Sequence, residues 1–162
     1  MVRDALASEF AEIGQLRVTA YRAGGFLSPS SQYAVTLAGL GTTGDGQILV
    51  AVQDGQMLGT VMLQFWPDAG RVVTGPAEAE IRALAVAPDG QGRGTGRALL
   101  QAVIGRAVAA GIRHLVLFTQ TDMLAAHHLY DQAGFGRLPE RDWSPEPGLT
   151  LLAYGLLLPA AG

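Results

Sequence analysis

Residues 81–96, IRALAVAPDGQGRGTG, constrain the fold of this chain more than any other segment. An apolar run typical of a strand ends at a Pro-Asp-Gly turn, and a glycine-rich loop leads into a helix expected over residues 95–110. Because the loop glycines lack shielding side chains, successive N–H groups can approach a phosphate at the helix N-terminus. Its glycines and arginines are Gly92, Arg93, Gly94, Gly96 and Arg97. The segment predicts a site for a phosphate-bearing ligand.

Three kinds of phosphate-binding loop have this general appearance. A P-loop requires Lys after its last glycine, but all 11 basic residues of this chain are arginine and that position is Arg97. A dinucleotide fold requires G-x-G-x-x-G after its first strand and an acid about 20 residues later. Here the loop lies past mid-chain, and Asp122 follows the next expected strand. The third pattern, Q/R-x-x-G-x-G/A, is filled by Gln91, Gly94 and Gly96, which resemble the coenzyme A pyrophosphate loop of the GNAT superfamily of N-acetyltransferases.

The sequence around the loop strengthens this resemblance. GNAT proteins place the loop after a strand that ends in V-x-P, which residues 84–88, LAVAP, supply. A helix, a strand and a helix ending in Y-x-x-x-G-F follow in the family. Residues 115–119, LVLFT, match that strand, and residues 129–135, LYDQAGF, match that ending. The resemblance covers residues 47–158 well and the N-terminal part only by pattern.

The resemblance implies an α/β protein with the GNAT fold: one domain over residues 1–162, whose mixed, mostly antiparallel sheet of six to seven strands is flanked by about four helices. Hydrophobic periodicity predicts strands at residues 2–6, 48–52, 57–65, 78–86, 115–119, 136–139 and 149–158. It predicts helices at residues 8–21, 30–40 and 95–110, and one that contains Tyr130. Ser8 is expected to cap the first helix, and Asp54-Gly55 to form a hairpin turn. Residues 66–77 and 141–148 are expected to be loops.

Composition limits the classes of partner. Hydrophobic residues make up 49% of the chain and charged residues only 15%, so the surface could include an association face, and a homodimer is a possible state. A net charge of -3 with scattered arginines argues against a nucleic-acid surface. The chain has no Cys, and its adjacent His127 and His128 point about 100° apart on a helix, so no metal site is expected. With no membrane span and no secretory signal expected, the cytoplasm is the default location.

The chemistry implied by the resemblance is acyl transfer from a thioester, with acetyl-CoA as cosubstrate. The pyrophosphate would bind to the loop residues Gln91, Gly92, Arg93, Gly94, Thr95, Gly96 and Arg97. The pantetheine arm would pair with the backbone of Leu84, Ala85 and Val86. A backbone N–H from Leu84 or Ala85 would stabilise the thioester oxygen as negative charge develops there.

An amine acceptor requires a base, because an alkyl amine is mostly protonated at neutral pH. Glu80 lies four residues before Leu84, on the same strand face by two-residue periodicity, at a position where some GNAT enzymes carry a general-base glutamate. Glu78 could be a second member of a water-linked relay. Tyr130 matches the family tyrosine that donates a proton to the leaving sulfur. Seven residues earlier, many members carry an asparagine that contacts the pantetheine arm, but this chain has Met123.

The acceptor is expected to be a small primary amine or a peptide N-terminus that attacks directly in a ternary complex. Candidate residues for its pocket are Tyr21, Phe26, Tyr33, Trp66 and Trp143, with Asp142 as a possible partner for a cationic amine. Three alternatives stay open: a non-catalytic acyl-CoA-binding or regulatory protein, an enzyme with a hydroxyl acceptor or a longer acyl donor, and a dinucleotide enzyme.

Overall fold

The structure is a computed structural model that describes residues 1–27 and 33–160. The chain forms two compact units, each built from two stretches. The first unit comprises Met1–Leu63 and Ala83–Val103, and the second comprises Gln64–Arg82 and Ile104–Gly162. The strands are hydrogen-bonded in the order β1-β2-β3-β4-β5-β8-β6, and β7 pairs with β8.

The first unit is built from antiparallel strands and helices. Its elements are β1 (Val2–Asp4), the 3₁₀ turn η1 (Ala7–Glu9), α1 (Phe10–Ala23), α2 (Tyr33–Gly39), β2 (Gln47–Gln53), most of β3 (Gln56–Phe65), the end of β4 (Glu78–Val86), η2 (Pro88–Gly90) and the start of α3 (Thr95–Ala109). β2 pairs with both β1 and β3. The expected hairpin turn is confirmed, since Asp54 and Gly55 both have left-handed backbone angles, with φ of 51° and 75°.

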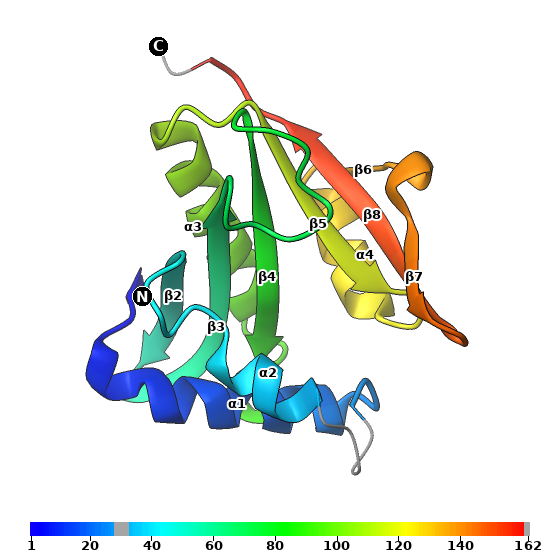
Figure 1. The fold of residues 1–162 in the computed structure, drawn as a ribbon. Helices are drawn as coiled ribbons and strands as arrows, with labels where there is room; N and C mark the ends of the chain where they lie inside the picture. The colour runs from blue at the N-terminus through cyan, green and yellow to red at the C-terminus, as the bar shows by residue number, and fades with distance from the viewer. Residues whose placement is uncertain (28–32, 161–162) are drawn as a thin grey trace. The chain divides into compact units, whose positions relative to one another are not determined.

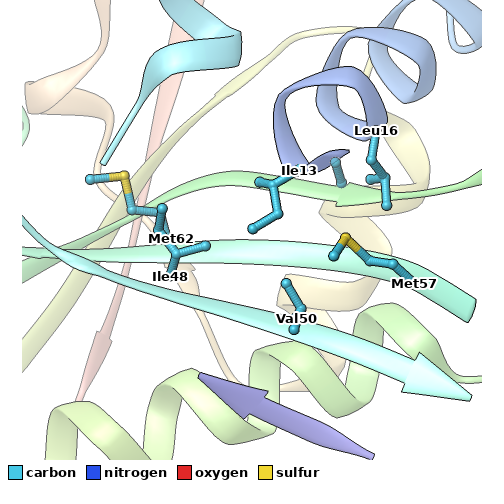
Figure 2. Packing of buried hydrophobic residues seen from close by; sticks show 7 residues of the cluster. Ile13, Leu16, Ile48, Val50, Met57 and Met62 are labelled. Atoms are coloured by element: carbon cyan, nitrogen blue, oxygen red, sulfur yellow. The ribbon is translucent and has the colours of Figure 1, made fainter. Parts of the chain in front are cut away.

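The core of the first unit lies between α1 and the strands. Figure 2 shows Ile13 and Leu16 beside side chains of β2 and β3. α1 and α2 lie side by side (Figure 1), and they approach so closely that a Cβ at Gly14 would lie 2.9 Å from the Ala38 oxygen. The fully buried Arg17 reinforces this contact, because its guanidinium donates to the carbonyl oxygens of Leu37 and Leu40, at 3.1 and 2.8 Å. These bonds satisfy acceptors at the C-terminal end of α2.

The second unit contains the start of β4 and most of the C-terminal half of the chain. Its further elements are the end of α3, β5 (His114–Gln120), α4 (Leu124–Gln132), β6 (Gly136–Arg137), the 3₁₀ turn η3 (Pro139–Arg141), β7 (Trp143–Glu146) and β8 (Leu149–Leu157). β5 runs parallel to β4 and antiparallel to β8. α4 packs on β8, with the ring of Tyr130 6.0 Å from that of Tyr154. The loop before β4 contributes the buried Val72 and Val73 to a core with Val116.

The expected fold class is confirmed, including the mixed, mostly antiparallel sheet and, among the described residues, four α-helices. The sheet has eight strands rather than six to seven. The extra strand is β7, so the expectation of a loop over residues 141–148 was wrong: Trp143 and Glu146 pair with Leu151 and Leu149 of β8. Pro145 fits here because β7 pairs with β8 alone.

The expected cap of the first helix was also wrong. Ser8 lies inside η1, and the Glu9 carboxylate instead accepts from the Leu6 N–H at 2.9 Å while pairing with Arg3 at 2.8 Å. The first strand and β6 are shorter than expected. Of the second expected helix, the structure places Tyr33–Gly39 in α2, and residues 30–32 lie outside the described part. None of the described helices has both the length and the apolar character needed to cross a membrane.

Candidate active site

The glycine-rich loop of the first unit has the backbone expected of an anion site. Gly92 and Gly94 have φ of 76° and 77°, in the left-handed region that glycine adopts without strain. The loop is fixed at its base, where the Thr95 hydroxyl donates to the Gly90 oxygen at 3.0 Å. Gly90 itself has no room for a side chain, since a Cβ would lie 2.8 Å from the Leu58 oxygen. The turn into α3 is therefore rigid where it begins.

The amide groups of this loop are available to a ligand. Within the described residues, no backbone carbonyl accepts from the N–H groups of residues 92–97, and the first bond into α3 runs from Ala98 N–H to the Gly94 oxygen at 3.0 Å. Arg93 and Arg97 are exposed, and neither has an acidic partner among those residues. Free amides and two arginines at a helix N-terminus fit a pyrophosphate. The same stretch of backbone begins at Leu84, Ala85 and Val86, of which Ala85 is buried.

Glu80, in the second unit, is a buried acid whose environment suits a base. Its side chain is 6% exposed, Oε1 accepts from the Gly70 N–H at 2.8 Å, and Oε2 lies 3.8 Å from Nε of Arg82. Burial raises the pKa of the Glu80 carboxyl above its ordinary value of 4.5, against the opposing effects of Arg82 and the Gly70 N–H. A carboxylate with a raised pKa accepts a proton more readily near neutral pH.

The extended backbone of β4 is interrupted between Glu80 and Leu84. The expected common face of Glu80 and Leu84 assumed unbroken alternation along the strand. Ala83, between them, has a φ of 53°, so the extended backbone is interrupted there. The strand therefore does not establish a common face for the two residues.

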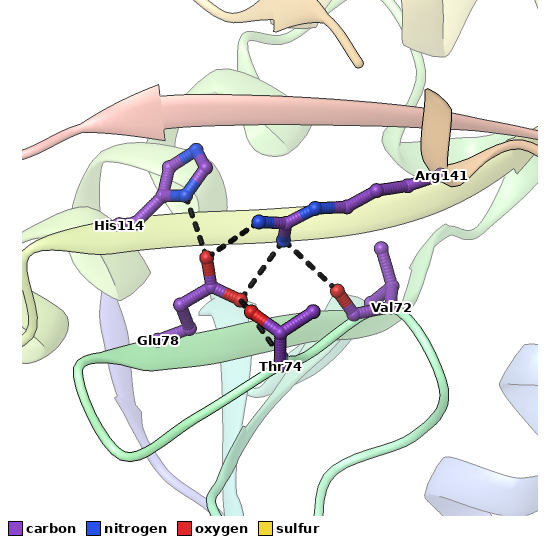
Figure 3. Close-up of polar contacts among 5 residues, drawn as sticks. All are labelled: Val72, Thr74, Glu78, His114 and Arg141. Atoms are coloured by element: carbon purple, nitrogen blue, oxygen red, sulfur yellow. Dashed lines mark hydrogen bonds and ion pairs between the residues drawn. The ribbon is translucent and has the colours of Figure 1, made fainter. Parts of the chain in front are cut away.

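Glu78 differs sharply from Glu80, although it lies only two residues away, and Figure 3 shows the polar contacts of Glu78. Arg141 donates to both of its oxygens, each at 2.9 Å, and Nδ1 of His114 lies 2.8 Å from Oε2. The N–H and hydroxyl of Thr74 also donate to Oε1. Burial opposes ionisation, but the bonds from Arg141, Thr74 and His114 outweigh it and lower the pKa of Glu78 to about 2. These contacts favour a structural role for Glu78 over a role as a proton relay.

Tyr130 lies near the end of α4 and is 5% exposed. Its ring is 5.6 Å from that of Phe135 and 6.0 Å from that of Tyr154, so the second expected motif, Y-x-x-x-G-F, folds back on itself. The Phe135 N–H completes this turn by donating to the backbone carbonyl oxygen of Tyr130 at 3.0 Å. Such packing holds the phenol in one orientation.

The aromatic residues predicted for an acceptor pocket occur in both units. Tyr21 lies in the last turn of α1, and Phe26 follows that helix and donates its N–H to the Tyr21 carbonyl oxygen at 2.9 Å. Tyr33 is exposed on α2. In the second unit, Trp66 is exposed and Trp143 packs against Phe118 at 6.2 Å.

The structure gives Asp142 partners other than the expected cationic amine. Its two oxygens are occupied by Arg137, at 2.8 and 2.6 Å, and Oδ1 also accepts from the Ala153 N–H. The Arg137 hydrogen bond lowers the pKa of the Asp142 carboxyl, which keeps it committed to this pair.

Comparison with known proteins decides which family has this arrangement. Residues 10–135 match the acetyltransferase (GNAT) family. The chain belongs to that family. The GNAT match includes the glycine-rich loop, Glu80 and Tyr130.

This GNAT chain is similar to two curated relatives that are named for an activity. It is 37% identical over 91 residues to a mycothiol acetyltransferase of Cellulomonas flavigena, covering 55% of this chain and 26% of that protein. It is 35% identical over 101 residues to an N-acetylaspartate synthetase of Danio rerio, covering 62% of this chain and 33% of that protein. The chain thus spans at most a third of the length of these relatives. A solved putative acetyltransferase of Salmonella typhimurium, with its cofactor acetyl-CoA, shares the fold, with a TM-score of 0.70, 21% identity, and 98% and 94% of the two chains covered.

Met123 departs from the GNAT pattern described above. It occupies the N-cap of α4 without a side-chain capping bond, and its sulfur accepts from the Thr119 hydroxyl at 3.6 Å. The side-chain carboxamide that the resemblance implies at this position is therefore replaced by a thioether.

Sequence reasoning also missed Gly70 and Arg71 in the loop before β4. The Gly70 N–H donates to Glu80 Oε1, and a Cβ at Gly70 would lie 2.9 Å from that oxygen, so a side chain there would require the Glu80 carboxylate to shift. The signal available was a glycine followed by a lone arginine and two valines, which does not reveal contact with a residue ten positions later.

Proposed function

We propose that this chain transfers an acetyl group from acetyl-CoA to an amine by direct attack in a ternary complex. The observation that carries the proposal is the loop at residues 91–97, with two left-handed glycines, unused amide groups and two arginines at the start of α3. It would hold the pyrophosphate, and the backbone of Leu84, Ala85 and Val86 would align the arm that bears the thioester. Family membership and the resemblance to a structure with acetyl-CoA support this cosubstrate.

Glu80 would act as the base. It removes a proton from the ammonium form of the acceptor, whose nitrogen then forms the new bond to the acetyl carbon as the carbon–sulfur bond breaks. Tyr130 would donate its phenolic proton to the leaving sulfur and regain a proton from the nitrogen of the tetrahedral intermediate, so the products are an amide and a free thiol, and the proton taken up by Glu80 is released to solvent. The buried Glu80 carboxyl with its raised pKa supports the first role, and the fixed Tyr130 ring the second.

The first experiment is calorimetric titration with acetyl-CoA, using NAD as the control ligand. One-to-one binding of acetyl-CoA alone supports the proposal, while binding of NAD alone would replace it with a dinucleotide site. Binding of acetyl-CoA without thiol release from any amine would favour the non-catalytic alternative. A hydroxyl acceptor or a longer acyl donor would appear as turnover in a panel of acceptors and acyl-CoA donors.

Gly94→Ala should weaken acetyl-CoA binding by at least roughly tenfold. A left-handed φ costs an L-residue about 1–2 kcal/mol, and a backbone that relaxed to avoid this strain would no longer point the residue 94 amide at the pyrophosphate. Gly105→Ala in α3 is the matched control: a Cβ there meets nothing within 4 Å. It should leave binding unchanged and stabilise the helix by up to about 1 kcal/mol. The same titrations, with thermal unfolding, measure both effects. Equal affinities of the two variants would contradict the assigned loop.

Tyr130→Phe should lower kcat roughly tenfold to 100-fold and leave acetyl-CoA affinity near wild type. The expected loss is at the lower end of the range for general acid catalysis, because a thiolate is a weak enough base to leave without full protonation. Phe keeps the ring contacts with Phe135 and Tyr154. Tyr154→Phe removes a phenol from the neighbouring ring and should retain turnover in a thiol-release assay. Similar losses in both variants would show that Tyr130 acts through packing.

The proposal extends to the organisation of the chain. Activity of residues 1–162 as one domain is supported by a family match that draws on both units. Self-association as a homodimer is supported by exposed apolar side chains such as Val35 and Leu157, at 81% and 78% exposure. The cytoplasm remains the proposed location.

A further inference from the structure

Arg71 is an exposed arginine that has no acidic partner among the described residues. It is the second residue of a β-turn closed by a hydrogen bond from the Val73 N–H to the Gly70 oxygen, at 3.1 Å. Its guanidinium carbon lies 4.7 Å from the ring centroid of Trp143. Within the described part of the chain, it makes no hydrogen bond or ion pair. Most other arginines of the second unit are bound to carboxylate or carbonyl oxygens, as Arg82, Arg137 and Arg141 are.

The backbone that carries Arg71 is held on both sides. On one side the Gly70 N–H donates to Glu80 Oε1 at 2.8 Å. On the other, Val72 is 1% exposed and its oxygen accepts from Arg141 at 3.1 Å, as Figure 3 shows. Arg141 is itself fixed to Glu78. An exposed arginine on so restrained a turn loses less conformational freedom on binding than one on a mobile loop.

Trp143 restrains the other end of the side chain. It pairs through β7 with Leu151 of β8 and packs on Phe118 at 6.2 Å. A guanidinium over an aromatic face keeps its N–H donors along its edge, where a planar carboxylate can accept two of them. The Trp143 ring therefore restrains the orientation of the Arg71 guanidinium.

We propose that Arg71, stacked on Trp143, binds a carboxylate of the acceptor, which makes the acceptor a small amine that also carries a carboxylate, such as an amino acid. This inference rests on the proposed function, because it relates Arg71 to the reaction through Gly70, the residue that holds the proposed base. Because Arg141 and Arg82 are paired with Glu78 and Glu80, Arg71 offers a single positive charge, which matches a carboxylate better than a phosphate dianion. An amine that carries no carboxylate would make no ion pair with Arg71.

The test compares the common amino acids with their C-terminal amides, which keep the amine and remove the negative charge. In thiol-release assays, wild type should favour the best amino acid over its amide by roughly 10- to 100-fold in kcat/KM. Arg71→Gln should abolish that preference, mainly through KM, and Arg71→Lys should restore part of it. Arg22→Gln is the matched control, since Arg22 is also exposed and has no acidic partner among the described residues. It should keep the wild-type preference.

A second measurement separates this inference from the proposed function. Calorimetry with N-acetyl amino acids and their amides reports on carboxylate binding without turnover. If wild type binds the N-acetyl amino acids, Arg71→Gln does not, and no amine is turned over, the carboxylate site at Arg71 is supported and the proposed acetyl transfer is overturned. Turnover of acid and amide at equal rates, a preference that survives Arg71→Gln, or a preference for amines that carry phosphate would overturn the carboxylate site. Absence of both binding and turnover across the panel would overturn it as well.

Discussion

Replacing Glu80 by glutamine is expected to lower kcat/KM at neutral pH by roughly 10³-fold while acetyl-CoA affinity stays near wild type. Glutamine has the same shape and can still accept the Gly70 N–H, but it cannot take a proton from the acceptor. Steady-state kinetics at saturating acetyl-CoA and calorimetric titration measure the two effects separately. Glu146→Gln, an exposed glutamate on β7 of the same unit, is the matched control and should retain activity.

The same substitution should make the protein more stable. The folded-state pKa of Glu80 is raised, so between pH 4.5 and that higher pKa the folded protein binds more protons than the unfolded chain, and stability falls as pH rises through this window. Glutamine removes the cost of burying the charge, so the melting temperature of Glu80→Gln should exceed that of wild type at pH 7 and match it near pH 4. Activity of wild type should show the opposite slope and rise through the window as the base loses its proton.

The opposite pH dependences of stability and activity distinguish a catalytic glutamate from a structural one. If Glu80 served only to stabilise the fold, its replacement would lower both the activity and the stability of the protein. Full activity of Glu80→Gln, or a loss of activity that follows a loss of stability, would contradict the base assignment. In that case the loop and the fold would remain, and another group would have to accept the proton.

Much of the fold could be predicted because its determinants are local. The strand over residues 78–86, the helix from Thr95 and the hairpin at Asp54-Gly55 follow from periodicity and turn chemistry. β7 was missed because Pro145 and a short polar stretch read as loop, and only pairing with β8 makes it a strand. Ser8 was misassigned because the carboxylate of the next residue competes for the same role.

The candidate site shows the same division. The conformation of the glycine-rich loop and the helix after it could be predicted, because the glycine spacing and the helical pattern lie in consecutive residues. Glu78 and Glu80 were not distinguishable by residue type or position. Their difference comes from Arg141, 63 residues away from Glu78, which neutralises one carboxylate and leaves the other buried with a raised pKa. Such long-range partners are invisible to periodicity, and the same is true of Arg71 and Trp143.

Arg141→Gln is expected to destabilise the protein by about 3–5 kcal/mol, because it leaves the buried Glu78 carboxylate without its bidentate partner. In wild type the Glu78 pKa of about 2 lies below its ordinary 4.5, so this group contributes about 3 kcal/mol above pH 4.5 that is lost as pH falls toward 2. The variant should therefore also begin to unfold at higher pH on acidification. Urea unfolding at a series of pH values measures both effects.

The control for this prediction is Arg137→Gln, which breaks a bidentate pair of similar geometry whose side chains are 34% and 25% exposed. Solvent screens this pair, so its loss should cost about 1 kcal/mol. If Arg141→Gln does not fold, Glu78→Gln combined with Arg141→Gln should, because removing both charges leaves no unpaired carboxylate in the interior. A double variant as unstable as the sum of the single changes, or equal losses at Arg141 and Arg137, would mean that the pair of Glu78 and Arg141 does not hold the loop before β4. Arg71 would then lack the rigid support on which its role in binding a carboxylate depends.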